Sequence, residues 1–359
     1  MFIIKKFRLL PKRYSFPIAM FSVKTIGTHS GNFHCDEVLA CTMLTRYTSV
    51  YKNAEITRTR DLSILSKLDI VVDVGGIYDP STNRFDHHQK EFQDKFSDKH
   101  SIRLSSAGLI YKHFGKEVLK NLIEQKISKD LNAYDINLEL TEAFLDMIYY
   151  KIYDNFIQAA DAIDNGVGQF SMEGKNLEPN YTINSDLGYR ISRMNPSWTE
   201  KKPDENAKFK EAMNLADEEL TDQVKGLIIS WWPARPIVQE AIDKRFEISK
   251  SGVIIKLRRP CPWKDHLTDI EKINNLEGNL KFVLFPEGPN GNWRVQGINL
   301  KGSFALRCAL KENWRGVNDF EKLKEVSGIE DIIFCHASGF IGGAKSLESV
   351  IKMAELSLN

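Results

Sequence analysis

The chain has 359 residues, of which 42% are hydrophobic and 27% are charged, and its formal net charge is +1 at pH 7. This composition is typical of a folded globular protein and excludes a disordered chain, and no stretch reaches the about 20 apolar residues that a membrane span needs. The balanced charge creates no overall field that would attract nucleic acid, so any such binding depends on a local patch. The length predicts two domains.

The first 22 residues are basic, and the first acidic residue of the chain is Asp36. This profile is typical of a mitochondrial presequence, although a basic tail without function has the same composition. The chain has five cysteines and no C-x-x-C pair. An odd number of unpaired cysteines indicates a reducing compartment rather than a disulfide scaffold.

The predicted elements begin with a strand at residues 23–26 and a helix over 36–50, which carries apolar residues at helical spacing. Further strands are predicted at 56–59 and 70–74, with a short helix over 61–68 between them. This β-α-β-α-β order with short connections predicts an α/β fold with a parallel sheet that is covered on both faces.

Two more helices complete the predicted first domain, residues 23–170. One begins at Ser105 or Ser106, where either serine could cap it or its free amides could face an anion. The other is amphipathic, covers 138–163, and stops at Gly166. Residues 171–206 are polar and contain prolines, so they form the predicted link to a second, smaller α/β domain at 207–359.

In the second domain, a helix with an apolar stripe is predicted at 209–227. The predicted strands are 253–255, 282–285, 293–298 and 332–336, and the segment Pro286 to Gly291 predicts a hairpin turn between the second and the third. A glycine loop is predicted at 337–343, ahead of a helix over 344–356. Such a loop could present amides to a phosphate, or it could be a tight turn that needs positive φ.

Histidines and acids gather in the loops that follow the strands of the first domain. Two clusters are present, His29, His34 and Asp36 in the first and Asp73, Asp86, His87 and His88 in the second. Parallel strands end at one edge of the sheet, so we expect these loops to meet there. Two divalent cations about 3.5–4 Å apart need a bridging carboxylate and mixed imidazole and carboxylate ligands.

The expected ligands are His29, His34 and Asp36 for one cation, Asp73 as the bridge, and His87 with Asp161 or Asp164 for the other. Acids at a helix C-terminus oppose the helix dipole, which favours a cation partner for at least one of the last two. Asp86 would orient an imidazole, and His88 would meet a phosphoryl oxygen or protonate a leaving group. Mixed ligands suit Mn²⁺ better than Mg²⁺, and zinc is a further alternative.

The second domain offers candidates for holding a substrate. Arg258 and Arg259 lie beside Trp263, which could form a surface for phosphates and stacked bases or a solvated edge with a packing indole. Arg294, in a predicted strand, and His336, just before the glycine loop, are placed to reach an anion.

The motifs around these residues resemble one family over nearly the whole chain. The segments are His29 to Glu37, Asp73 to Asp79, Arg84 to Gln89, Asp161 to Gly166, and His336 to Gly343. They are similar to the Myg-type (melanocyte proliferating gene product) exonuclease family, which is itself similar to the Asp-His-His phosphoesterases. The first motif departs from the wider superfamily by one extra residue and by an imidazole, His34, in place of a carboxylate.

This resemblance implies a phosphoesterase with metals on its first domain and a smaller domain that grips the substrate, with His336, Gly342 and Gly343 as substrate contacts. It implies a manganese-dependent 3'-5' exonuclease that acts on RNA in mitochondria and nucleus. Two alternatives remain. The same site could hydrolyse small phosphoanhydrides or short oligonucleotides, or the chain could be a metal-stabilised RNA-binding regulator without turnover. No membrane partner is expected, and the sequence leaves the oligomeric state open.

Overall fold

The computed structural model describes residues 23–134, 136, 138–170, 181–288 and 291–358. The predicted leader, residues 1–22, lies outside this part of the chain, as do residues 171–180 of the predicted link and residues 289–290 of the predicted hairpin turn. Among the described helices, none combines the length and the apolar character that crossing a membrane requires.

The chain divides into two compact units. The first comprises the described residues through Asn121 and Tyr149–Glu219, and the second comprises Leu122–Ile148 and the described residues from Leu220 onward. The predicted domain ranges, 23–170 and 207–359, differ from this division in two places. Residues 122–148 group with the C-terminal unit, and the boundary falls inside helix α7 (Glu205–Gly226).

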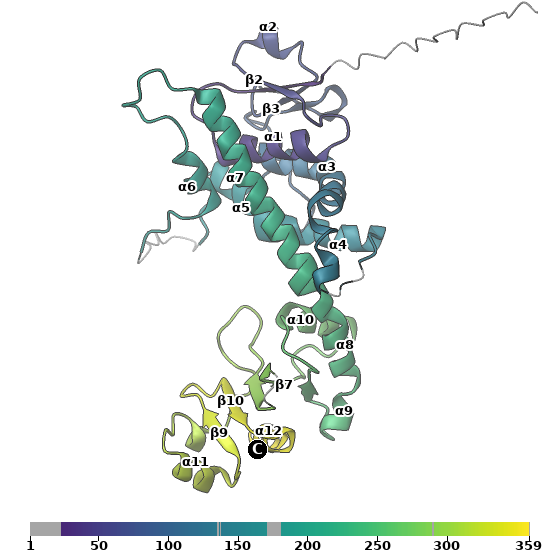
Figure 1. Cartoon of the computed structure of the whole chain (residues 1–359), viewed down its shortest axis with the longest axis vertical. Helices are drawn as coiled ribbons and strands as arrows, with labels where there is room; N and C mark the ends of the chain where they lie inside the picture. The colour runs from purple at the N-terminus through teal and green to yellow at the C-terminus, as the bar shows by residue number, and fades with distance from the viewer. Residues whose placement is uncertain (1–22, 135, 137, 171–180, 289–290, 359) are drawn as a thin grey trace, which may run out of the picture. The chain divides into compact units, whose positions relative to one another are not determined.

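A five-stranded sheet organises the first unit, in the order β2-β1-β3-β5-β4. Figure 1 labels two of its strands, β2 and β3. Its strands are β1 (Thr25–Thr28), β2 (Glu55–Arg58), β3 (Ile70–Val72), β4 (Tyr78–Asp79) and β5 (Arg84–Phe85). All neighbours pair in parallel except β4, which runs antiparallel to β5 at one edge. The predicted α/β fold is therefore confirmed, and the sheet that was predicted to be parallel is parallel except for β4.

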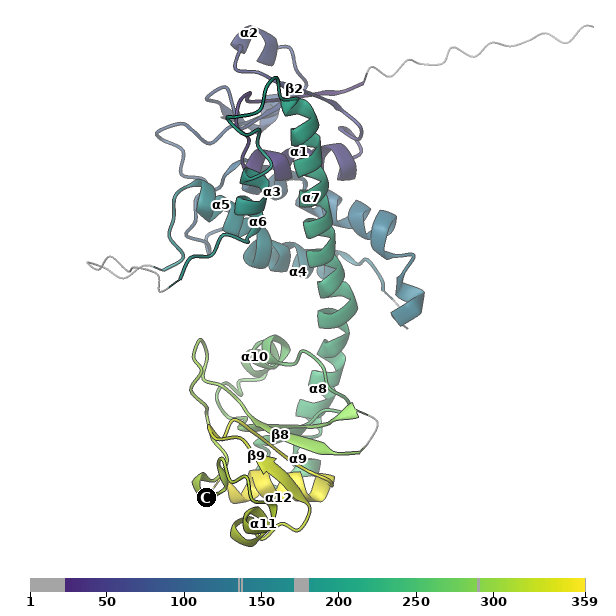
Figure 2. The same cartoon turned by 60° about the vertical axis from the view of Figure 1, so that its left-hand side comes forward.

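Helices surround this sheet, and three of them frame the site described below. The helices are α1 (Cys35–Tyr47), α2 (Leu62–Leu65), α3 (Ser106–Leu122), α4 (Glu142–Ile152), α5 (Gln158–Asp164) and α6 (Leu187–Ser192), and those at the site are α1, α5 and α6. Figure 2 shows α6 near α1 and α5, and α1 contacts both of the other two.

The predicted helix over 138–163 is present, but its start is four residues later than predicted. The Phe144 amide donates to Thr141 Oγ1 at 3.2 Å. This bond caps the first turn of α4, so residues 138–141 precede the helix. The helix continues through a π-helical turn, Tyr153–Ile157, into α5, and Gly166 (φ +69°) follows its end as predicted.

The second unit has its own five-stranded sheet, in the order β6-β7-β8-β10-β9. Its elements are β6 (Ile254–Lys256), β7 (Phe282–Pro286), β8 (Trp293–Gly297), β9 (Ile332–Cys335), β10 (Ile341–Ala344), α8 (Arg235–Asp243), α9 (Arg245–Ile248), α10 (Lys264–Ile273), α11 (Phe320–Ser327) and α12 (Leu347–Leu356). Along β7 the buried side chains alternate between two cores. Phe282 and Leu284 pack in the same core as Met353 of α12, and Val283 packs in the other with Ile270 of α10.

The predicted glycine loop at 337–343 is wrong in part, because Gly342 and Gly343 belong to β10, which pairs with both β8 and β9. A Cβ atom at Gly342 would lie 2.7 Å from the side chain of Met353, and one at Gly343 would lie 2.9 Å from the ring of Phe334. These glycines therefore allow close packing on the two faces of a strand, and their amides are not free for a phosphate. The turn is at Gly339 (φ +70°).

Candidate metal centre

The ends of three neighbouring parallel strands supply the core of the site. His29 directly follows β1, Asp73 directly follows β3, and His87 lies two residues beyond β5. These three side chains are buried. The predicted meeting of the three loops at one edge of the sheet is what brings the imidazoles and the carboxylate together.

Asp73 lies between the two histidines. Its Oδ2 atom is 3.3 Å from His29 Nε2, and its Oδ1 atom is 3.2 Å from His87 Nε2. Ser106 Oγ donates to Oδ1 at 3.1 Å. Burial raises the pKa of Asp73, but the hydrogen bond with His29 and the nearby imidazole of His87 outweigh it and hold that pKa well below the ordinary value. Each oxygen of this carboxylate therefore faces a different imidazole.

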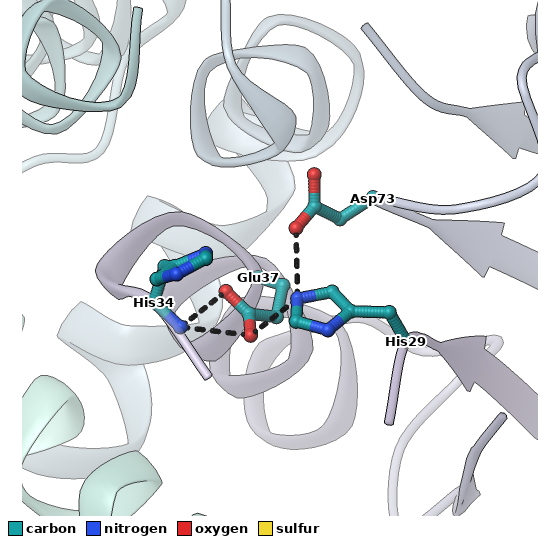
Figure 3. Close-up of side chains that lie close together, drawn as sticks. All are labelled: His29, His34, Glu37 and Asp73. Atoms are coloured by element: carbon teal, nitrogen blue, oxygen red, sulfur yellow. Dashed lines mark hydrogen bonds and ion pairs between the residues drawn. The ribbon is translucent and has the colours of Figure 1, made fainter. Parts of the chain in front are cut away.

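Glu37 completes the arrangement around His29 (Figure 3), and the sequence prediction missed it. The His34 amide donates to both oxygens of Glu37, at 2.9 and 3.0 Å, and His29 Nε2 lies 3.0 Å from Oε1. The signal in the sequence is the spacing of His34 at the helix N-cap and Glu37 three residues later, the spacing of a capping box. Glu37 is fully buried, so it joins the helix start to the site.

His29 is held as a cation by this environment. Burial lowers its pKa, but hydrogen bonds to Asp73 and Glu37 and their negative charges raise it to about 10. Its Nδ1 atom lies 3.2 Å from the Ser30 carbonyl oxygen, which can accept a hydrogen bond from a protonated Nδ1, and 3.2 Å from Arg60 Nη2. A metal cation at Nε2 would replace the proton there and leave Nδ1 protonated and oriented by Ser30.

Three buried polar atoms near Asp73 lack hydrogen-bond partners within the described residues. They are Asp36 Oδ1 and both ring nitrogens of His87. His87 Nε2 lies 3.2 Å from Asp164 Oδ2 and 3.9 Å from Asp36 Oδ2. Burial, together with the charges of Asp73 and Asp164, raises the pKa of Asp36 well above its ordinary value. A group of buried acids in this state fits a divalent cation that would supply the missing positive charge.

Asp161 and Asp164 differ in their partners, although they lie three residues apart on α5. The oxygens of Asp161 accept hydrogen bonds from Ser105 N (2.9 Å), Ser105 Oγ (2.7 Å), Gly108 N (3.0 Å) and the Tyr153 hydroxyl (2.9 Å). Asp161 is therefore the anion that the free amides at the start of α3 face. Asp164 lies against His87 instead, so the geometry favours Asp164 as the ligand.

Asp86 holds His88 in place. Asp86 Oδ1 is 2.7 Å from His88 Nδ1, and Asp86 Oδ2 accepts a hydrogen bond from the Gly76 amide at 2.5 Å. The hydrogen bond with Asp86 raises the pKa of His88 above its ordinary value. The His88 side chain is 63% exposed, so the ring faces solvent while its Nδ1 is fixed.

Asn195, in the predicted link, is a second residue that the sequence prediction missed. Its side-chain oxygen accepts from the Phe33 amide at 2.8 Å, and its side-chain nitrogen donates to the Phe33 carbonyl at 2.8 Å. The paired bonds fix the loop that carries His29 and His34. No local pattern marks Asn195, because its partner lies 162 positions earlier in the chain.

Three groups of side chains place their ligand atoms within 4.8 Å of one another, as a shared cation requires. They are His29, His34, Glu37 and Asp73, then Asp73, His87 and His88, and finally His34, Asp36 and Asp164. The partition differs from the predicted one, because Glu37 enters the first group and Asp36 groups with Asp164. These groups could bind metal ions, and their mixed nitrogen and oxygen donors suit borderline divalent cations.

Comparisons with known proteins identify the family of this chain. The family model MYG1_exonuc, described as "Uncharacterised protein family (UPF0160)", matches residues 25–358. The chain belongs to the MYG1 exonuclease family. It is 42% identical over 340 residues to the MYG1 exonuclease of Homo sapiens, covering 93% of this chain and 85% of that protein. It is also 42% identical over 339 residues to the MYG1 protein of Dictyostelium discoideum, covering 93% and 96% of the two chains. No solved structure matches.

In this MYG1-family chain a pocket of about 430 Å³ lies beside the ligand groups. It is lined by His34, Cys35, Asp36, Ala160, Ile163, Asp164, Gly188, Tyr189 and Ser192. All of these residues belong to the first unit. The pocket therefore gives the candidate ligands His34, Asp36 and Asp164 an opening toward solvent.

The predicted substrate contacts of this MYG1-family chain lie in the second unit. Arg294 forms an ion pair with Glu287, and its guanidinium carbon lies 5.0 Å from the centre of the Phe334 ring. His336 is exposed. Arg258 is 61% exposed, with Glu240 at 3.8 Å, and Arg259 is exposed as well. Trp263 is buried in the core, which agrees with the packing alternative and not with base stacking.

Proposed function

We propose that this chain is a metal-dependent exonuclease that removes nucleotides from the 3' end of RNA with the help of two divalent cations. The observation that carries the proposal is Asp73, whose two oxygens each face a different histidine, at 3.3 and 3.2 Å. A carboxylate that joins two ligand groups is the central requirement of a two-metal phosphoesterase. Relatives that carry the name exonuclease support a nuclease rather than another hydrolase.

Each residue then has a role that its position supports. His29, His34 and Glu37 would hold one cation and His87 with Asp164 the other, while Asp36 would contribute from the group that it forms with His34 and Asp164. When bound, manganese ions would polarise the phosphodiester and lower the pKa of the attacking water. Magnesium is the alternative cation.

His88 is the proposed proton donor. Its hydrogen bond to Asp86 raises its pKa, so more of the imidazole is protonated at neutral pH. An exposed imidazolium with Nδ1 fixed by Asp86 has Nε2 available for a phosphoryl oxygen or for the leaving oxygen of the substrate. Asp86 acts through this orientation and contacts no substrate itself.

The RNA chain would be held by cations of the second unit. Arg258 and Arg259 are exposed and suit the phosphates of a polynucleotide, with a contribution from His336 and Arg294. Mitochondria and nucleus are the proposed locations, and a fusion of residues 1–22 to a fluorescent reporter tests the mitochondrial one.

The decisive experiment compares RNA labelled at either end, with Mn²⁺ titrated against wild-type protein and Asp73→Asn. We expect the 5' label to give a ladder that shortens stepwise and the 3' label to be released as a mononucleotide. Turnover by Asp73→Asn should fall by more than about 100-fold, because loss of an outer partner of a metal ligand already costs 10–100-fold. Asp79→Asn, an acid of the same sheet outside the ligand groups, is the matched control and should retain activity.

RNA binding without cleavage at any Mn²⁺ concentration would contradict the proposal and leave a binding protein.

A second candidate is hydrolysis of short oligonucleotides or small phosphoanhydrides, which the limited pocket of about 430 Å³ favours. Salt separates the two enzymes, since the affinity for long RNA should fall steeply with ionic strength and that for a dinucleotide should fall little.

A further inference from the structure

The lining of the pocket beside the ligand groups has two chemically different parts. His34, Asp36 and Asp164 belong to the candidate metal centre. The remaining lining residues are small or apolar side chains of α1, α5 and α6 and the ring of Tyr189. A substrate phosphate would lie at the candidate ligands, because the cations would be there. The group joined to that phosphate would then meet the remaining residues.

We propose that this pocket receives the base of the 3'-terminal nucleoside, with Tyr189 as the face on which the base stacks. The inference rests on the proposed exonuclease function and extends it to the group that is removed. The volume of about 430 Å³ lies in the range of small-ligand sites, which starts at about 300 Å³. Aromatic stacking is the usual way in which proteins hold single-stranded bases without regard to sequence.

Tyr189 is an exposed aromatic ring on a well-fixed helix. It is 51% exposed, although α6 is anchored on its other sides. Asp186 Oδ1 accepts from the Tyr189 amide at 3.0 Å, Arg190 pairs with Glu219 at 3.0 Å, and Ile191 is fully buried. A large ring that is positioned in this way without being packed is suited to contact a ligand.

The lining predicts the selectivity of this subsite. Among the described residues that line the pocket there is no asparagine, glutamine, lysine or arginine, and the hydroxyls of Ser192 and Tyr189 can donate to or accept from any base. All four bases should therefore be accepted, and purines should bind more tightly than pyrimidines because they offer more stacking area.

Gly188 provides a second way to test the pocket. A Cβ atom there would lie 3.2 Å from Asp186 Oδ1 and 3.9 Å from Ile163, so an alanine fits with little adjustment. A leucine side chain would extend into the space that the base needs. Neither Gly188 nor Tyr189 belongs to the ligand groups.

The experiment measures cleavage of two RNAs that differ only in their 3' nucleoside, which carries adenine in one and is abasic in the other. Wild-type protein should cleave the adenine end about tenfold or more faster, as kcat/KM. Tyr189→Ala and Gly188→Leu should cleave both ends at the slow rate, while Tyr189→Phe and Gly188→Ala should keep the preference. Tyr134→Ala, a change at a tyrosine with 48% exposure in the second unit, is the control and should keep the preference too.

A Tyr189→Ala variant that slows both RNAs by the same factor would overturn the subsite. Binding of adenosine 5'-monophosphate, followed by NMR of its adenine protons, gives a readout that does not depend on cleavage. Nucleotide binding that is lost in Tyr189→Ala, in a protein that cleaves no RNA, would refute the exonuclease function and keep the pocket. If the protein cleaves RNA and Tyr189→Ala changes neither the cleavage preference nor nucleotide binding, the exonuclease function is kept and the subsite is refuted.

Discussion

Two buried acids, one in each unit, differ in how their charge is compensated. Glu271 in the second unit is 1% exposed, and both of its oxygens are bound by Arg307, at 2.6 and 2.8 Å. Asp36 in the first unit is also 1% exposed, yet its Oδ1 atom has no hydrogen-bond partner among the described residues. A buried acid with a complete partner has its charge balanced within the fold, so removing either partner leaves an uncompensated charge, whereas a buried acid with an incomplete partner marks a place for an external cation.

The largest effect on stability should come from breaking the complete pair. We expect Glu271→Gln to lower the free energy of unfolding by about 3–5 kcal/mol, because it leaves the buried Arg307 without a counter-charge. Chemical denaturation of the metal-free protein measures this change. The stabilisation on adding Mn²⁺ should match that of the wild type, and a reduced gain would contradict the separation of the two kinds of acid.

Asp36→Asn should change the stabilisation by Mn²⁺ rather than the stability of the metal-free protein. Without a cation the variant should be as stable as the wild type or more so, because burial and the charges of Asp73 and Asp164 already disfavour the ionised form of Asp36. Mn²⁺ at about 100 times its Kd should stabilise the wild type by about 2.7 kcal/mol and the variant far less. Thermal unfolding with and without Mn²⁺ tests this, and an equal gain in both proteins would remove Asp36 from the metal centre.

Asp69 is a partly exposed acid, and its substitution should have the smallest effect on the free energy of unfolding. Asp69 is half-buried and accepts hydrogen bonds from Lys24 at 2.6 Å and from the Thr25 amide at 2.9 Å, which lower its pKa from 3.8 to about 2. A lowered pKa in the folded state contributes stability above pH 3.8 that is lost as the pH falls through about 2. Asp69→Asn should therefore lower the stability at neutral pH by the modest amount that this pair contributes, and the stability of the variant should change less than that of the wild type between pH 3.8 and about 2. If the stability of Asp69→Asn falls between pH 3.8 and about 2 as steeply as that of the wild type, the contact between Asp69 and Lys24 does not contribute to stability.

The sequence predicted the positions that depend on strand order. His29, Asp73 and His87 meet because parallel strands end at one edge, a rule that holds without knowledge of side-chain packing. Glu37 and Asn195 were missed because their roles depend on backbone groups, the His34 amide and the two polar groups of Phe33. Periodicity does not register such contacts.

Other differences arose where one pattern fits two structures. Two acids on one helix face look equivalent in sequence, but only Asp161 meets the amides at the start of α3. Gly342 and Gly343 fit a turn as well as a strand that approaches its neighbours closely, and the side chains of Met353 and Phe334 decide for the strand. Contacts between residues far apart in the chain decide both cases, so the local spacing of residues could not predict them.

The backbone of Asp73 has a practical consequence for capturing a complex with RNA. Its φ of +58° places a non-glycine residue in the left-handed region, which asparagine tolerates better than other residues. An alanine or a glutamate there would disturb the loop as well as the charge. An inactive protein intended for crystals with uncleaved substrate should therefore carry asparagine at this position, so that the turn keeps its shape while the carboxylate is lost.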